Sequence, residues 1–135
     1  MLTFAIEPLA GIWDEKVACA QAHWAETTMC ANGEVMDLRY ERYAQYEAAG
    51  WYMEFVARDE THEVAGFCGM YLLPSMHTQK LLATEDVLYL KPGYRVGRNG
   101  VNFYRAVELE MGRRGAAKLM LTAPPGSSSS RILSR

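Results

Sequence analysis

The stretch that decides the fold covers residues 89–100 and reads Tyr89-Leu90-Lys91-Pro92-Gly93-Tyr94-Arg95-Val96-Gly97-Arg98-Asn99-Gly100. An apolar run ends in it at a Pro-Gly turn, and an amphipathic segment, Val101 to Arg114, begins directly after it. This order predicts a strand, a basic loop that contains glycine, and a helix. Such an arrangement presents backbone N–H groups at a helix N-terminus, where a phosphate or pyrophosphate binds readily. The stretch therefore indicates a protein that binds a phosphorylated ligand.

The composition narrows the class of protein. The chain has 135 residues, of which 50% are hydrophobic and 22% charged, which predicts one folded domain over residues 1–135. A formal net charge of −2 argues against a general nucleic-acid binder, which is usually basic. No apolar run approaches the roughly 18 residues of a membrane span, and the N-terminus lacks the pattern of a signal peptide. We therefore expect a cytoplasmic protein with neither nucleic acid nor membrane as partner.

The cysteines are few and widely spaced. Cys19, Cys30 and Cys68 form an odd set without the CxxC spacing of a zinc site or a disulfide framework. We therefore expect buried free thiols and no metal site.

Hydrophobic periodicity and turn residues predict the order of elements. Strands are expected over 2–6, 51–58, 63–73, 81–90 and 118–122, and helices over 14–28, 36–49 and 101–114. The resulting order, β-α-α-β-β-β-α-β, predicts an α+β (α/β) fold with a mixed central sheet whose last β-α-β unit is parallel.

Several residues predict local features within these elements. Gly50 and Gly115 are expected to end helices. Gly66 and Gly69 lie inside a predicted strand and indicate a bulge or a close backbone approach. In the first helix, the apolar side is expected to comprise Val17, Ala20, Trp24 and Thr28.

The sequence resembles the GNAT superfamily of acyl-CoA N-acyltransferases. The resemblance rests on residues 85–95, on the loop to Gly100 and the helix after it, and on Gly115-Ala116 before the last strand. The beginning of the chain is also similar to small GNAT-like proteins of phages and prophages, in Glu7-Pro8-Leu9, Trp13-Asp14-Glu15 and His23-Trp24.

The pyrophosphate loop departs from the pattern of this family at one position. The family reads Arg/Gln-x-x-Gly-x-Gly/Ala, and Arg95 and Gly100 match its first and last positions. Arg98 occupies the position of the middle glycine, and a glycine stands at Gly97 instead. Arg98 either adds positive charge beside a bound anion or fills space that a glycine leaves open. The sequence leaves both interpretations open.

The resemblance implies acetyl-CoA as co-substrate and a primary amine, on a small molecule or a peptide, as acceptor. The backbone of Leu88, Tyr89 and Leu90 would meet the pantetheine arm. The pyrophosphate would lie against the backbone of the loop residues, which are Arg95, Val96, Gly97, Arg98, Asn99 and Gly100. The amine would attack the thioester directly.

A carboxylate near the amine would help it to lose its proton, and Glu85 and Asp86 are the nearest candidates. Neighbouring residues of a regular strand face opposite ways, which puts Asp86 on the face of Leu88 and Leu90. A bulge, frequent at this point in the family, would exchange the two. Alternatively, both are solvent carboxylates at a strand end. No tyrosine follows Tyr104, so the residue that would protonate the leaving thiolate is unassigned.

The C-terminal part also departs from the family, which usually continues through a helix and two more strands. The predicted last strand would then have an exposed edge, and an exposed edge favours pairing with a second chain. We therefore expect a homodimer through that edge. Residues 123–135, with Ser127 to Ser130, are expected to form a flexible tail or a helix N-cap region.

Two functions follow from these observations. The first is an acetyl-CoA-dependent N-acetyltransferase, supported by the strand, loop and helix and by the Glu85-Asp86 pair. The second is a non-catalytic GNAT-fold protein, either a CoA-binding remnant or a phage-related assembly protein, favoured by Arg98 and the short C-terminus. A nucleotide-binding module of another fold is disfavoured because the loop has neither Gly-Lys-Ser/Thr nor GxGxxG. The aromatic residues of 40–52 either line an acceptor pocket or pack in the interior.

Overall fold

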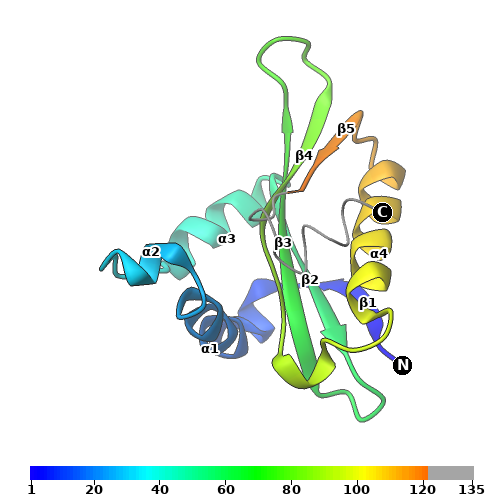
Figure 1. Cartoon of the computed structure of the whole chain (residues 1–135). Helices are drawn as coiled ribbons and strands as arrows, with labels where there is room; N and C mark the ends of the chain where they lie inside the picture. The colour runs from blue at the N-terminus through cyan, green and yellow to red at the C-terminus, as the bar shows by residue number, and fades with distance from the viewer. Residues whose placement is uncertain (122–135) are drawn as a thin grey trace.

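The computed structural model describes residues 1–121, which form a mixed five-stranded sheet flanked by helices (Figure 1). The sheet order is β1-β2-β3-β4-β5, with bounds β1 Thr3–Glu7, β2 Tyr52–Arg58, β3 Val64–Pro74, β4 Leu81–Leu90 and β5 Lys118–Met120. Strands β1 to β4 pair antiparallel, and β4 pairs with β5 in parallel. The predicted α+β fold, the order of its predicted elements and its parallel β-α-β unit are confirmed, and one further short helix, over Thr28–Ala31, was not predicted.

The helices cover both faces of the sheet. They are α1 Trp13–Trp24, α2 Thr28–Ala31, α3 Tyr40–Ala48 and α4 Asn99–Arg113, with short 3-10 helices η1 Leu9–Gly11 and η2 Pro92–Tyr94. Figure 1 shows α1, α2 and α3 on one side of the sheet and α4 on the other. The helix expected over 14–28 ends earlier, at Trp24, and the helix expected over 36–49 begins later, at Tyr40. No helix within residues 1–121 is both long and apolar enough to span a membrane.

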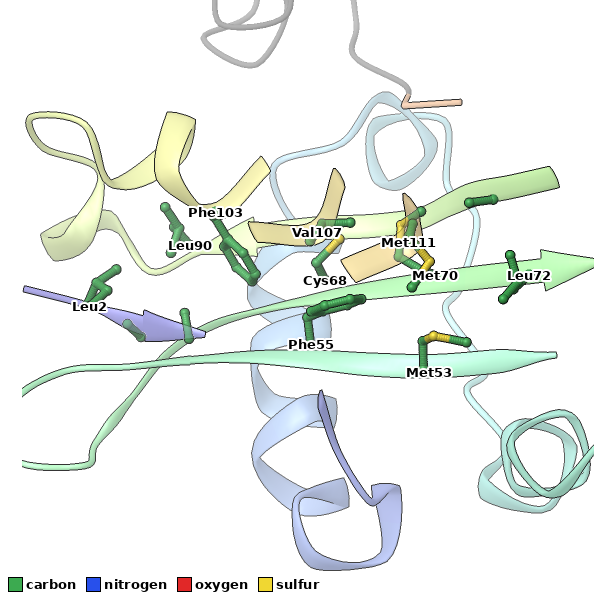
Figure 2. Close-up of a cluster of buried hydrophobic side chains, with 13 residues drawn as sticks. Leu2, Met53, Phe55, Cys68, Met70, Leu72, Leu90, Phe103, Val107 and Met111 are labelled. Atoms are coloured by element: carbon green, nitrogen blue, oxygen red, sulfur yellow. The ribbon is translucent and has the colours of Figure 1, made fainter. Parts of the chain in front are cut away.

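The larger core lies between the sheet and α4 (Figure 2). Phe103, Val107 and Met111 recur along one face of α4 and are at most 1% exposed, as the helical periodicity predicts. Phe103 stacks on Phe4 of β1 with ring centroids 4.9 Å apart. This packing fixes α4, and with it the loop that precedes the helix, against the sheet.

A second core lies between the sheet and α1. The buried side of α1 differs from the predicted one, because the buried residues lie one position earlier in the sequence. The side chains of α1 that are buried are Lys16 and Cys19, whereas Val17 and Ala20 are only partly buried. Lys16 was not among the residues that the prediction placed on the apolar side. Its burial has a specific cause, which is an ion pair with Glu54 of β2.

Glycine positions end two helices as predicted. Gly50 has φ +79°, and Trp51 N–H donates to the Tyr46 carbonyl oxygen at 2.9 Å. Gly115 has φ +93°, and Ala116 N–H donates to the Met111 carbonyl oxygen at 3.0 Å. Both are left-handed caps that satisfy carbonyls of the last helical turn.

The glycines inside β3 mark close approaches, and one of them lies at a bulge. A Cβ built on Gly66 would overlap the backbone oxygen of Tyr89, and one built on Gly69 would overlap the Tyr52 hydroxyl. The register between β3 and β4 shifts at this point, because Gly69 pairs with Val87 and Met70 pairs with Glu85. Asp86 is therefore the extra residue of a β-bulge in β4.

The thiol prediction is correct in part. The three cysteines are free, with Cys19 and Cys68 buried, but Cys30 is exposed. Within residues 1–121, no group of three or more His, Cys, Asp or Glu side chains is arranged to hold a metal ion. The expected tail over 123–135, with Ser127 to Ser130, lies outside the described residues.

Substituting Gly66→Ala tests the close approach of β3 to β4. The new Cβ would meet backbone rather than a flexible side chain, so we expect a loss of about 1–3 kcal/mol of unfolding free energy. Gly112→Ala is the matched control, because nothing lies within 4 Å of a Cβ there and alanine in a helix gains about 0.5–1 kcal/mol over glycine. Urea denaturation measures both. Equal effects at the two positions would contradict the close approach.

Candidate functional site

The bulge in β4 sends two neighbouring carboxylates to opposite faces of the sheet. Glu85 pairs with Met70, faces the α4 core and is 7% exposed. Asp86 faces α3, where its Oδ2 accepts a hydrogen bond from the Tyr43 hydroxyl at 3.1 Å. Of the alternatives left open by the sequence, the bulge is therefore the correct one. The interpretation of both residues as solvent carboxylates is wrong for Glu85.

Asp86 is surrounded by tyrosines that keep their protons. Burial raises the pKa of Tyr43, and the neighbouring Asp86 raises it further. Burial raises the pKa of Tyr71 to about 12, and Asp86 contributes to this rise. Asp86 also accepts a hydrogen bond from the Tyr71 hydroxyl. Both hydroxyls therefore stay protonated at neutral pH and act as donors toward the carboxylate. They hold Asp86 in one orientation on this face of the sheet.

A buried ion pair lies beneath these tyrosines. Lys16 Nζ of α1 lies 2.5 Å from Glu54 Oε1 of β2, and the two side chains are 3% and 0% exposed. The Tyr52 hydroxyl donates to Glu54 Oε1 at 2.6 Å and accepts from Lys16 Nζ at 3.3 Å. Within the described residues, Glu54 Oε2 has no hydrogen-bond partner. Burial raises the pKa of the Glu54 carboxyl, and the Lys16 ammonium opposes that rise.

The sequence prediction missed this ion pair, although one signal pointed to it. Glu54 stands in the middle of the otherwise apolar run Tyr52-Met53-Glu54-Phe55-Val56-Ala57. A carboxylate on a buried strand is costly unless it is paired. The partner could not be predicted, because Lys16 is 38 positions away in the chain, on a separate helix.

A groove of about 650 Å³ lies between β3 and the segment formed by α3 and the residues just before it. Tyr43 and Tyr71, the two tyrosines that contact Asp86, form part of its wall. The other polar and aromatic side chains that line it are Asp37, Arg39, Arg42 and Tyr46. Of the predicted aromatic residues of 40–52, Tyr43 and Tyr46 therefore line a pocket, whereas Tyr52 is 1% exposed and packs in the interior.

The other half of the site is the end of β4. Strand β5 pairs with β4 only from Leu82 with Lys118 to Thr84 with Met120. Among the described residues, no strand pairs with that edge of β4 from Glu85 onward. Of the predicted pantetheine contacts, Tyr89 and Leu90 have buried side chains and Leu88 is half-buried. An unpaired strand edge offers backbone N–H and C=O groups to an extended ligand.

The Arg95 side chain is engaged by the protein itself. Its Nε donates to the Leu90 carbonyl oxygen at 2.7 Å, and its Nη2 donates to Glu26 Oε1 at 3.0 Å. The guanidinium carbon also lies 5.1 Å from the centroid of the Tyr89 ring. Arg95 therefore fixes the loop against β4 and the residues that follow α1, and its charge is largely balanced by Glu26.

The remaining loop residues form the N-terminus of α4. Gly97 has φ +57°, which favours glycine, and the exposed Arg98 is the N-cap residue. No side chain caps this helix within the described residues, and its first turn has no acidic residue. A helix N-terminus of this kind attracts an anion. Asn99 N–H already donates to the Val96 carbonyl oxygen at 3.2 Å, so an anion at this helix start would meet the other backbone N–H groups.

Structural comparison identifies the fold. An aminoglycoside acetyltransferase from an uncultured soil metagenomic sample, in complex with trehalose, superposes with a TM-score of 0.77 and 15% identity, over 99% of this chain and 85% of that one. The fold is that of the GNAT acetyltransferases. A ribosomal-protein-alanine N-acetyltransferase from Brucella melitensis biovar Abortus 2308 gives a TM-score of 0.70 at 20% identity, over 98% and 86% of the two chains.

A third GNAT structure was determined with acetyl-CoA. This predicted acetyltransferase from Clostridium acetobutylicum has a TM-score of 0.71 and 11% identity, over 99% of this chain and 87% of that one. No protein-family model matches the chain, and no curated protein sequence matches it. The comparisons therefore establish the GNAT fold.

Replacing Lys16→Met tests the buried ion pair. It leaves the Glu54 carboxylate buried without a counter-charge, so we expect a loss of about 3–5 kcal/mol of unfolding free energy at pH 7. The double variant with Glu54→Gln should recover most of that loss, which a double-mutant cycle by urea denaturation measures.

The pH dependence of Lys16→Met separates this cause from a packing defect. Without Lys16 the pKa of Glu54 rises further above 4.5. A carboxyl whose pKa is higher in the folded state destabilises the fold as pH rises and it ionises. The loss should therefore be smaller at about pH 5 than at pH 7. An equal loss at both pH values would contradict a buried Glu54 charge.

Proposed function

We propose that this protein is an acetyl-CoA-dependent N-acetyltransferase that acts on a primary amine. The observation that carries the proposal is the β4 bulge, which turns Asp86 toward Tyr43 and Tyr71, two residues that line the groove. The proposal is supported by solved structures with the same fold. They include an aminoglycoside acetyltransferase and a ribosomal-protein-alanine N-acetyltransferase.

The residues of the cofactor half suit acetyl-CoA, which supplies the acetyl group as a thioester. Its pantetheine arm would lie along the unpaired edge of β4 at Leu88, Tyr89 and Leu90. The pyrophosphate would be held by backbone N–H groups at the start of α4. These are the groups of residues 96–98 and 100, because Arg95 N–H and Asn99 N–H already donate to the Pro92 and Val96 carbonyl oxygens. The exposed Arg98 side chain adds positive charge there.

Asp86 is the proposed proton acceptor. An amine is protonated at neutral pH and attacks only after it loses a proton, which an Asp86 carboxylate oxygen accepts directly or through a water molecule. Tyr43 and Tyr71 orient this carboxylate by donating hydrogen bonds to it. Glu85 is assigned no part in the reaction, because it is buried on the opposite face. The proton donor for the departing thiolate is unassigned.

A non-catalytic GNAT-fold protein is the second candidate. It is favoured by the engagement of Arg95 with Glu26 and Leu90 and by Arg98 at the position of the family's middle glycine.

A homodimer also stays a proposal. It is supported by the place of β5 at the end of the sheet order within the described residues.

Calorimetry with acetyl-CoA and with desulfo-CoA tests the cofactor half. We expect both to bind at ligand concentrations up to about 1 mM. Gly100→Trp should abolish binding, because a bulky side chain in the first turn of α4 would exclude the pyrophosphate. Gly112→Trp, at the exposed other end of the same helix, is the matched control and should bind normally. Absence of binding to the wild-type protein would refute the proposed enzyme.

Asp86→Asn tests the proton acceptor, with any amine from a panel that the wild type acetylates. We expect kcat/KM to fall about 100-fold or more near pH 7, with acetyl-CoA affinity unchanged. The defect should shrink as pH rises, because a larger share of the amine is then already deprotonated. Glu85→Gln, on the other face of the sheet, should keep the wild-type pH profile. The reverse pattern in these two variants would overturn the assignment.

A further inference from the structure

The charged side chains of the groove are not balanced. Asp37, Arg39 and Arg42 line it, which gives two positive charges and one negative charge. Arg39 is paired with Asp37, with Nε at 3.1 Å and Nη2 at 2.9 Å from Oδ2. Arg42 makes no side-chain hydrogen bond or ion pair within residues 1–121. One guanidinium with its full hydrogen-bonding capacity therefore lines the wall of the groove.

The rest of the groove is aromatic and apolar. Tyr43, Tyr46 and Tyr71 line it together with Leu38 and Leu73. Tyr46 and Tyr71 are in edge contact, with centroids 6.1 Å apart. Such a wall suits a ligand with an apolar or aromatic body, which gains free energy from burial and ring packing.

Asp86 and Arg42 would attract opposite charges. Asp86 does not line the groove itself but accepts hydrogen bonds from Tyr43 and Tyr71, which do, and its carboxylate attracts an ammonium group. Arg42 attracts an anion, and its planar guanidinium matches a carboxylate or a phosphate with two parallel hydrogen bonds. A compound with several ammonium groups would be repelled at Arg42.

We propose that the acceptor is a primary amine that also carries an anionic group, a carboxylate or a phosphate, on an apolar or aromatic body. Arg42 binds the anion while the amine points to Asp86. The proposal rests on the proposed function and adds the substrate class. Arg42 contacts only the non-reacting part of the acceptor, so it acts on affinity and specificity.

Matched pairs of amines test the anion requirement. The probes are phenylalanine, Gly-Phe and Gly-Gly-Phe, each compared with its own C-terminal amide, so that the distance from amine to carboxylate is varied. O-phosphoethanolamine compared with ethanolamine tests a phosphate in place of the carboxylate. We expect the anionic member of at least one pair to have a kcat/KM about five- to tenfold higher. Added salt should reduce that preference. A preference for the neutral member in every pair would overturn the proposal.

Variants of Arg42 test whether this residue causes the preference for anionic amines. Arg42→Gln should remove the preference, and Arg42→Lys should retain part of it, because the charge stays and the two-pronged geometry is lost. Arg113→Gln is the control, since Arg113 is paired with Glu110 on α4, on the other side of the sheet. A preference unchanged in Arg42→Gln would overturn the role of Arg42.

Binding of the acetylated compounds tests anion recognition by Arg42 independently of the acetyl transfer. N-acetyl-Gly-Phe and its amide, or the best pair, are titrated by NMR against the wild type and Arg42→Gln. Tighter binding of the anion to the wild type alone would support the inference even if no amine were acetylated, a result that would refute only the proposed enzyme. Equal binding of anion and amide would overturn the inference, whatever the turnover.

Discussion

The β-bulge at Asp86 is the constraint on which the site depends. In a regular strand, Asp86 would face the core that α4 fills, and Glu85 would face the groove. One extra residue in β4 opposite Gly69 and Met70 reverses this arrangement. It buries Glu85 beside Met70 and presents Asp86 to Tyr43 and Tyr71. Because β5 stops pairing at Thr84, the bulge also lies where the open edge of β4 begins. The proposed acceptor and cofactor halves therefore meet at one point of the sheet.

The buried ion pair connects α1 and the tyrosines to the face of the sheet on which Asp86 lies. Lys16 reaches the sheet from α1 and contacts Glu54, while its ammonium lies 5.2 Å from the centroid of the Tyr43 ring on α3. Tyr52 joins the same cluster through its hydroxyl, which the missing side chain at Gly69 accommodates. A buried pair is weak evidence for added stability. It does fix geometry, since each charge is costly without the other.

The features that the sequence predicts are those set by residues close together in the chain, and the features it misses depend on residues far apart. Strands, helices and the caps at Gly50 and Gly115 follow from local periodicity and glycine positions, and they were predicted within a few residues. The bulge was foreseen only as one of several alternatives, because register depends on the partner strand. The burial of Lys16 was missed because the partner that stabilises it, Glu54, is distant in the chain. The groove depends on how α3 packs on β3, which no local pattern contains.

The loop before α4 departs from the GNAT pattern, and this departure bears on the proposal that it binds a pyrophosphate. Arg95 is used to fix the loop, through Leu90 and Glu26, so the positive charge beside an anion has to come from elsewhere. Arg98 stands at the start of α4, exposed and without a side-chain hydrogen bond to the helix end. Gly97 takes the left-handed conformation one residue earlier, so the chain still makes its turn into the helix. Together, Gly97 and Arg98 leave an uncapped helix N-terminus with a cation beside it. These are the two features that an anion requires of such a loop, and they favour retained cofactor binding over a remnant.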